Sequence, residues 1–163
     1  MDSDIVSGYR PGVVGRITEM HGTYYSRHWG FGLFFESRVA VELSEFLNRF
    51  DESHDGIWVA AVNGKTVGSI VIDGKGADRE GARLRWFIIE PACHGTGIGN
   101  RLMEKAVGFC RKAGFPSVHL STFVGLDAAR HLYEKWGFTL QGEHEGDQWG
   151  SVVLEQIFRL DLR

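Results

Sequence analysis

The fold of this chain is decided by the stretch LRWFIIEPACHGTGIGN at residues 84–100. Its first six residues are apolar, β-branched or aromatic except for Arg85, a composition typical of a strand. Glu90-Pro91 ends this strand, glycines recur at positions 95, 97 and 99, and a helical pattern begins at Asn100. The stretch therefore predicts a strand, a glycine-rich loop and the start of a helix.

The glycine-rich loop suits an anionic ligand. Glycines at alternate positions let successive backbone N–H groups converge on one concavity, and the helix start adds unpaired N–H groups and partial positive charge. A dinucleotide fingerprint would need a third glycine where Asn100 stands and an acidic residue near Val118, and a nucleotide-triphosphate loop would need Gly-Lys-Ser/Thr. Neither pattern is present, so we expect a different phosphorylated cofactor.

Two motifs carry a family resemblance. The run His94-Gly95-Thr96-Gly97-Ile98-Gly99 resembles the acetyl-CoA signature of the GNAT superfamily of N-acetyltransferases, Arg/Gln-x-x-Gly-x-Gly/Ala after a strand, with His94 in place of Arg or Gln. The run ARHLYEKWGF at residues 129–138 looks like the late helix of that superfamily. The resemblance covers roughly residues 57–138. Residues 10–25 also look like the acetyltransferase half of bacterial proteins that fuse a MarR-type regulator to a GNAT domain.

The resemblance implies an α/β fold of mixed α+β type. We expect a central mixed, mostly antiparallel sheet of six to seven strands with a splayed parallel pair and about four helices, in a single N-acetyltransferase domain at residues 1–163. Acetyl-CoA is then the cosubstrate, and no metal is expected. By resemblance the strand backbone binds the pantetheine arm and the loop holds the pyrophosphate, which makes the cofactor-binding residues Phe87, Ile88, Ile89, His94, Gly95, Thr96, Gly97, Ile98, Gly99 and Asn100.

The catalytic candidate is Tyr133. It matches the tyrosine that protonates the departing thiolate in the superfamily, whereas the alternative is an aromatic residue that only packs on the inner face of its helix. The general base is left open among Glu80, Glu90, His21, His28 and His119, and solvent is a further candidate. Cys93 lies near the loop, but direct transfer of the acetyl group needs no acyl-cysteine.

Composition sets the bounds for the remaining expectations. The chain has 163 residues, 43% of them apolar and 24% charged, a formal charge of -3, and only two cysteines. These values predict one folded, soluble domain in the cytoplasm, without a disulfide framework. With no long basic tract and no long apolar run, we expect neither a nucleic acid nor a membrane as partner. The expected partner is an amine substrate, and a homodimer is left open.

Hydrophobic periodicity and turn residues predict the elements in chain order. Strands are expected at residues 5–10, 57–62, 66–72, 83–89, 117–122, 138–143 and 152–160, and helices at residues 13–20, 35–47, 98–113 and 126–136. Asn63-Gly64 predicts a tight antiparallel hairpin. We expect Gly22 to weaken the first helix, and the aromatic residues that follow are either core or a substrate wall.

Three functions are compatible with these motifs. The first is an acetyl-CoA-dependent N-acetyltransferase that acts on a primary amine of a small molecule or a protein by direct attack on the thioester. The second is a non-catalytic acyl-CoA-binding sensor or regulatory module, which the departures at His94 and at Leu126, where the family often has Asn, would favour. The third is an interaction domain with a vestigial site. Binding of CoA and thiol release with an amine separate the three.

Overall fold

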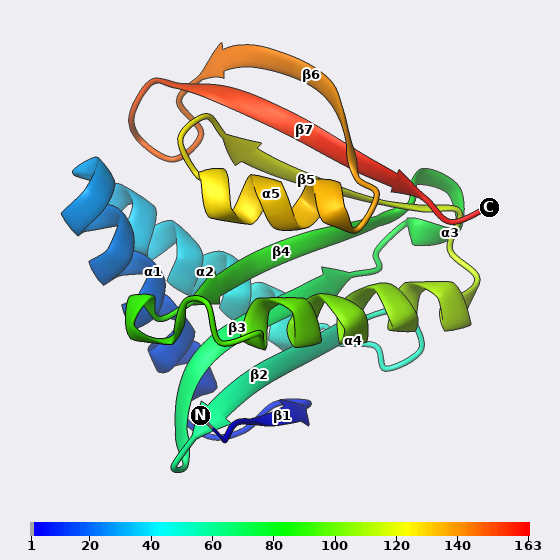
Figure 1. The fold of residues 1–163 in the computed structure, drawn as a ribbon, viewed down its shortest axis with the longest axis horizontal. Coiled ribbons are helices and arrows are strands. Elements are labelled where there is room, and N and C mark those ends of the chain that lie inside the picture. Colours follow the sequence, from blue (N-terminus) through cyan, green and yellow to red (C-terminus); the bar gives the residue numbers. More distant parts are fainter. Residues whose placement is uncertain (1) are drawn as a thin grey trace.

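Seven strands form one mixed sheet in the order β1-β2-β3-β4-β5-β7-β6 (Figure 1). The computed structural model describes residues 2–163. The strands are β1 (Asp4–Ser7), β2 (Gly56–Val62), β3 (Lys65–Asp73), β4 (Ala82–Ile89), β5 (Ser117–Phe123), β6 (Thr139–Gly146) and β7 (Val153–Asp161). Neighbouring strands are antiparallel except β4 and β5, which run parallel. The predicted mixed sheet with one parallel pair is therefore confirmed.

The β2–β3 hairpin closes as its sequence predicts. Asn63 and Gly64 both have positive φ, 51° and 78°, which is the backbone of the two-residue turn that best matches strand twist. Val62 pairs with Lys65 directly across the turn. Local residue preference therefore fixes the register of this part of the sheet.

The helices cover both faces of the sheet. They are α1 (Val13–Trp29), α2 (Leu33–Asn48), the single turn α3 (Ala77–Glu80), α4 (Ile98–Ala113), α5 (Asp127–Lys135) and the short 3₁₀ helix η1 (Pro91–Cys93). In Figure 1, α4 and α5 lie on the face toward the viewer, and α1 and α2 lie behind the sheet. The turn α3 is an addition to the four predicted helices and lies within the charged segment that precedes β4.

Helix α1 is longer than predicted, so the expectation that it weakens at Gly22 is wrong. The helix continues to Trp29 and ends at Gly30, whose φ is 69°. A Cβ at Gly22 would collide with the carboxylate of Glu36 on α2. Close packing of the two helices thus offsets the low helix propensity of glycine, and the first residues of the aromatic stretch belong to α1.

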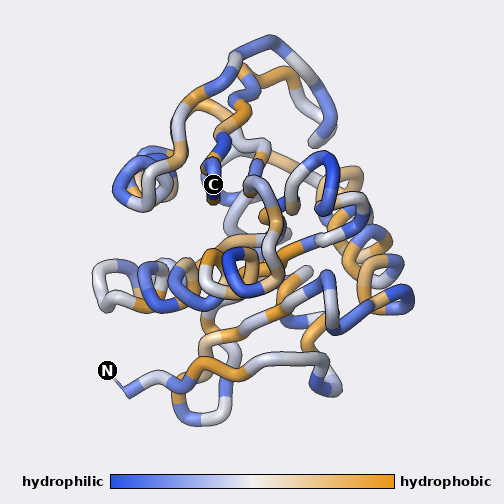
Figure 2. The backbone as a smooth tube through the Cα atoms, turned by 90° about the vertical axis from the view of Figure 1, so that its right-hand side faces the viewer, coloured by the Kyte–Doolittle hydropathy of each residue, from blue (hydrophilic) through white to orange (hydrophobic). Residues whose placement is uncertain are grey.

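The two larger of three apolar clusters among the described residues lie on opposite faces of the sheet. One packs α4 against β3 and β4, with Ile72, Leu84 and Leu102 fully or almost fully buried. The other packs α1 and α2 against the opposite face, around Ile17 and Leu43. In Figure 2 the hydrophobic residues concentrate in the strands and on the helices, whereas several loop tips are hydrophilic. Burial on both sides explains why β2 is almost continuously apolar in sequence.

Strands β4 and β5 diverge soon after they pair. Their register contains two pairs, Ala82 with Val118 and Arg83 with His119. Beyond these pairs, β4 has no partner on β5 among the described residues, and Figure 1 shows the two strands spreading apart. This is the predicted splayed pair. No helix within residues 2–163 combines the length and the apolarity needed to cross a membrane.

Candidate active site

A groove of about 650 Å³ follows the gap between β4 and β5. Its walls come from the last residues of β4, the glycine-rich loop, the start of α4, the middle of β5 and the inner face of α5. Each predicted cofactor-binding residue except Thr96 lines it, and so does Tyr133. Thr96 instead donates its hydroxyl hydrogen to the Cys93 carbonyl, 2.6 Å away, within the loop. The fold thus brings the two sequence motifs to one groove.

A bulge in β4 shapes one wall of the groove. Val71 pairs with Arg85, but Ser69 pairs with Ile88, so β4 contains an extra residue at this point. Trp86 has a φ of 44°, which is rare for a bulky residue. The Ser69 hydroxyl donates to the Trp86 carbonyl at 2.7 Å. This bond satisfies the Trp86 carbonyl, which has no ladder partner because the bulge interrupts the strand pairing. The bulge also changes the direction of the backbone that follows. Sequence reasoning missed it, because no local signal marks Trp86.

The glycine-rich loop presents backbone at the mouth of the groove. Gly95 and Gly97 have φ of 76° and 84°, and a Cβ at either would meet no protein atom within 4 Å among the described residues. Gly97 is the N-cap of α4 and makes no side-chain cap bond, and the first turn of α4 has no acidic residue. The unpaired N–H groups of this helix start therefore face a ligand without a competing carboxylate, which suits a phosphate group.

Gly99 and Asn100 hold the start of α4 in place. A Cβ at Gly99 would lie 2.9 Å from Ile89 Cδ1 and 3.3 Å from Leu132 Cδ2, so glycine lets the helix approach β4 and α5 closely. The Asn100 Oδ1 accepts a hydrogen bond from the Trp136 indole N–H at 3.0 Å. These contacts fix the loop relative to the late helix, α5.

The His94 side chain forms a hydrogen bond with the end of β4. Its Nε2 lies 2.9 Å from the Ile89 carbonyl oxygen, which requires the tautomer with a hydrogen on Nε2 as donor. The bond ties the loop to the end of β4. It directs one ring nitrogen to protein backbone, while the ring itself is exposed at the groove.

Tyr133 and Tyr25 lie in the middle of the site. Tyr133 is 6% exposed and packs against Phe87, Phe138 and Phe158 with ring centroids 5.9 to 6.0 Å away. Burial raises the pKa of both tyrosines, and Tyr133 raises the pKa of Tyr25 further. Both phenols therefore stay protonated near neutral pH and can donate a proton. Tyr25 was considered in the sequence only as core or wall, and it lines the groove.

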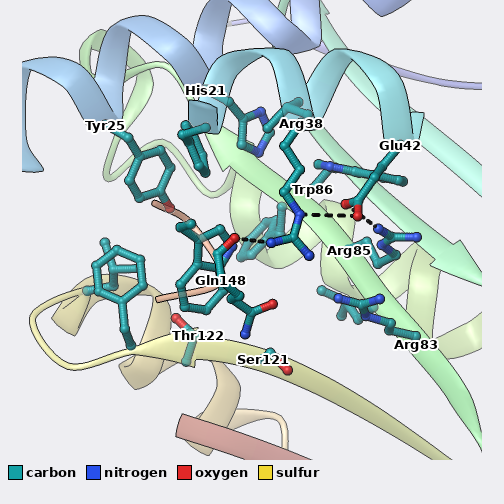
Figure 3. Close-up of a pocket in the computed structure, with 17 residues that line it drawn as sticks. His21, Tyr25, Arg38, Glu42, Arg83, Arg85, Trp86, Ser121, Thr122 and Gln148 are labelled. Carbon is teal, nitrogen blue, oxygen red and sulfur yellow. Dashed lines mark hydrogen bonds and ion pairs between the residues drawn. The ribbon is translucent and has the colours of Figure 1, made fainter. Parts of the chain in front are cut away.

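A second, smaller hollow of about 120 Å³ adjoins the groove and is called the basic pocket below. It lies on the face of the sheet covered by α1 and α2. Its polar lining includes His21, Arg38, Glu42, Arg83, Arg85, Ser121, Thr122 and Gln148, which are labelled in Figure 3. The basic pocket and the groove share wall residues on β4 and β5, among them Trp86, Phe87 and Thr122. The two cavities are therefore adjacent at the β4–β5 gap.

The five candidates for the general base lie in three places. His21 lines the basic pocket. Glu90 and His28 line a neighbouring hollow on the α1 side of β4, where Glu90 forms an ion pair with Arg16 at 2.6 Å. His119 lies beside Arg83 where β4 and β5 pair, and Glu80 lies on α3 at the same closed end.

His21 is held as a neutral imidazole. Its Nδ1 lies 2.8 Å from the Ile17 carbonyl and donates to it. The ring stacks on Tyr25 and is 5% exposed. Burial lowers the pKa of His21 to about 4, and the bond to Ile17 opposes this lowering only in part. His21 is thus uncharged near neutral pH and is a weak base.

Comparison with known proteins agrees with this architecture. The model of a family described as the acetyltransferase (GNAT) family matches residues 16–138. An uncharacterized N-acetyltransferase of Methanocaldococcus jannaschii is 31% identical over 121 residues, which are 71% of this chain and 53% of that protein. An N-acetylaspartate synthetase of Xenopus tropicalis is 31% identical over 104 residues, 62% of this chain and 38% of that protein. The chain spans about half or less of the length of these relatives.

Solved structures share the fold over almost the whole chain. An acetyltransferase of the GNAT family from Staphylococcus aureus Mu50 has a TM-score of 0.79 at 16% identity and covers 99% of this chain and 100% of its own. A yncA protein from Salmonella typhimurium, described as a putative acetyltransferase and solved with acetyl-CoA, has a TM-score of 0.74 at 18% identity and covers 100% of this chain and 95% of its own.

Proposed function

Since the chain belongs to the acetyltransferase (GNAT) family, we propose that it transfers an acetyl group from acetyl-CoA to a primary amine by direct attack of the amine on the thioester. The observation that carries this proposal is the β4–β5 gap, which has an anion-binding loop at one mouth and a separate pocket for a second ligand on the opposite face of the sheet. Direct transfer requires two ligands that meet in one opening, and this arrangement supplies it.

The groove fits acetyl-CoA in its chemistry as well as its volume. The pyrophosphate binds the backbone N–H groups at Gly95–Asn100, because this helix start offers unpaired donors and no acidic side chain. The amide groups of the pantetheine arm pair with the backbone of Phe87–Ile89, which faces the gap where β5 has diverged. His94 acts through its bond to the Ile89 carbonyl, which positions the loop beside this strand.

Two protein groups serve the chemical step. A backbone N–H near Ile88 or Ile89, re-aimed by the bulge at Trp86, stabilises the negative charge that develops on the thioester oxygen. Tyr133 donates its proton to the departing thiolate, and burial favours this role because it keeps the phenol protonated. Tyr25 lines the same groove and lies close enough to Tyr133 for that residue to raise the pKa of Tyr25.

The amine enters through the basic pocket and reaches the thioester through the shared wall. We assign its deprotonation to solvent, because His21, the base candidate that lines this pocket, has its pKa lowered to about 4 and would take a proton from an ammonium group only at a large cost. Location in the cytoplasm, a homodimer and a likeness to the acetyltransferase half of MarR-type fusion proteins stay predictions.

A non-catalytic acyl-CoA sensor is the second candidate function. The observation that favours it is Leu126, which lines both cavities with an apolar side chain. A sensor would bind acetyl-CoA in the same groove but release no thiol with any amine. Binding and turnover therefore have to be measured separately.

The test is a titration of acetyl-CoA combined with a panel of primary amines scored by thiol release. Gly97→Ala places a Cβ on the open side of the loop and should weaken acetyl-CoA binding at least about tenfold. Gly114→Ala is the matched control, because Gly114 has a φ of 79° at the other end of α4 and is equally open. Both variants carry the same backbone strain of about 1 kcal/mol. Equal acetyl-CoA affinity in the two variants would exclude the loop as the phosphate site. If acetyl-CoA binds but none of the amines in the panel causes thiol release, the sensor is favoured.

A further inference from the structure

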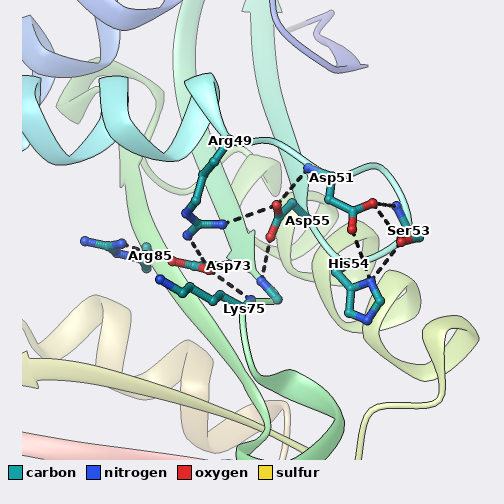
Figure 4. A network of polar contacts seen from close by, with 9 residues as sticks. Arg49, Asp51, Ser53, His54, Asp55, Asp73, Lys75 and Arg85 are labelled. Carbon is teal, nitrogen blue, oxygen red and sulfur yellow. Dashed lines mark hydrogen bonds and ion pairs between the residues drawn. The ribbon is translucent and has the colours of Figure 1, made fainter.

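The basic pocket contains one guanidinium group that no carboxylate of the described residues contacts. Figure 4 shows the neighbouring network, in which Arg49 contacts Asp55 and Asp73, and Arg85 also contacts Asp73. Arg85 continues to Glu42, which also pairs with Arg38. With Arg83 included, four guanidinium groups stand against three carboxylates.

Arg83 is the residue left over. Asp73 lies directly opposite it in the β3–β4 register, but the Asp73 carboxylate is taken by Arg49 at 2.7 Å and by Arg85 at 3.2 Å. Arg83 makes no hydrogen bond or ion pair with a side chain of the described residues. It is partly buried, and burial followed by the nearby Arg85 lowers its pKa, while the carboxylates of Glu42 and Asp73 act from a distance in the opposite direction. An arginine remains charged near neutral pH. A charge in this position is stabilised when an anion binds beside it.

Arg38 reaches the same pocket from α2. Its Nε lies 3.2 Å from Glu42, and an Nη group donates to the Gln148 carbonyl in the loop between β6 and β7. In Figure 3 the side chains of Arg38, Arg83 and Arg85 lie together on one side of the pocket, and Tyr25 lies on the other. Arg38 and Arg83 line the basic pocket and not the groove, whereas Arg85 and Tyr25 line both.

We propose that the acceptor is a small primary amine that also carries a carboxylate, and that Arg83, assisted by Arg38, binds this carboxylate while the amine points through the β4–β5 gap. This inference rests on the proposed acetyl transfer. A carboxylate matches the planar fork of a guanidinium and would supply the missing counter-charge. A second ammonium group would meet Arg38, Arg83 and Arg85 and be repelled, so the pocket disfavours polyamines. The small volume of about 120 Å³ favours a compact molecule.

The first experiment compares matched acceptors in the wild-type protein. Amino acids, β-alanine and γ-aminobutyrate are each paired with the corresponding carboxamide, which keeps the amine and removes the negative charge. Binding is measured with CoA-saturated protein by calorimetry, or through the fluorescence of Trp86 and Trp149, which line the pocket. Thiol release is measured separately with acetyl-CoA. The best acid should bind about 10- to 100-fold more tightly than its carboxamide, as expected for charge-assisted hydrogen bonds.

The second experiment assigns the effect to a residue. Arg83→Gln should raise the dissociation constant and KM of the acid by about 10- to 100-fold and leave those of the carboxamide nearly unchanged, so that the two acceptors of a pair become similar. Arg38→Gln changes a residue on a different element, α2, and should also reduce the difference in affinity between the acid and its carboxamide. Arg111→Gln, on the exposed last turn of α4, is the control and should keep the wild-type preference. Acetyl-CoA affinity should be unchanged in all three.

The outcomes separate this inference from the proposed function. Acid and carboxamide that bind equally in the wild type, or a preference for the acid that survives in Arg83→Gln, would overturn the carboxylate site even if neutral amines are acetylated. Selective binding of the acid without thiol release would support the carboxylate site and count against acetyl transfer. Selective binding of the acid together with thiol release would support both the carboxylate site and acetyl transfer, provided that Arg83→Gln loses binding and thiol release for the acid but not for the carboxamide.

Discussion

Replacing His21 by asparagine should flatten the dependence of stability on pH. His21 is buried and neutral in the fold, with a pKa of about 4 against an ordinary value of 6.5. Near neutral pH, His21 is mostly unprotonated in both the folded and the unfolded chain. As the pH falls below 6.5, the unfolded chain takes up a proton that the folded chain excludes, so the free energy of unfolding decreases until the pH reaches about 4.

The size of the effect follows from the shift. One unit of pKa corresponds to about 1.4 kcal/mol, so the wild type should lose about 2 kcal/mol at this residue by about pH 5 and about 3 kcal/mol by about pH 4. Asparagine removes the titration and keeps a donor for the Ile17 carbonyl, which His21 Nδ1 now contacts at 2.8 Å. Arg38 and Glu42, the charged groups of α2 that line the same pocket, are unchanged.

The assay is urea denaturation from about pH 7 to about pH 5, with the loss of stability compared between wild type and His21→Asn. Comparing the change in unfolding free energy between the two pH values removes the constant cost of the smaller side chain. It also cancels the contributions of other titrating groups, including His119, whose pKa is lowered by burial as well. His28→Asn, exposed on the same helix, should keep the wild-type slope. A slope in His21→Asn equal to that of the wild type would refute the reasoning, because the protein would then bind the proton at His21 without penalty.

Three further outcomes are expected. Tyr133→Phe should lower turnover by roughly 10²-fold with acetyl-CoA affinity nearly intact, measured by thiol release and direct titration; full turnover would leave solvent as the proton source. His94→Arg should leave the pH dependence of CoA affinity unchanged, because the ring is bonded to Ile89; a dissociation constant that rises through the imidazole titration only in the wild type would instead assign the side chain to a phosphate. Leu102→Ala, at a fully buried position of α4, should cost about 2 to 5 kcal/mol in urea denaturation.

Features that depend on near neighbours could be predicted from the sequence. Asn63-Gly64 specifies its turn because few other residues adopt positive φ at two successive positions. The apolar repeat from Ile98 and the glycine at position 114 specify α4 from its first to its last turn, and the structure has these bounds. A strand, crossover helix and strand in succession require a parallel pair, which the structure confirms. The predicted cofactor residues and Tyr133 were placed by family resemblance, and all of them except Thr96 line one groove.

Features that depend on contacts between distant residues could not be predicted. The sequence predicts that Gly22 weakens α1, yet the helix continues past it, and Glu36 on another helix occupies the space that a Cβ would fill. The bulge at Trp86 depends on a hydroxyl from β3.

The sequence by itself determined the order of the seven strands and of α1, α2, α4 and α5, the glycine loop and the family resemblance, since each rests on residues a few positions apart. Only the tertiary structure decided the basic pocket, because α2 supplies Arg38, β4 supplies Arg83 and the β6–β7 loop supplies Gln148. Whether an arginine keeps a counter-ion depends on which carboxylates the fold brings within reach. The carboxylate of Asp73, which lies opposite Arg83, instead forms ion pairs with Arg49 and Arg85.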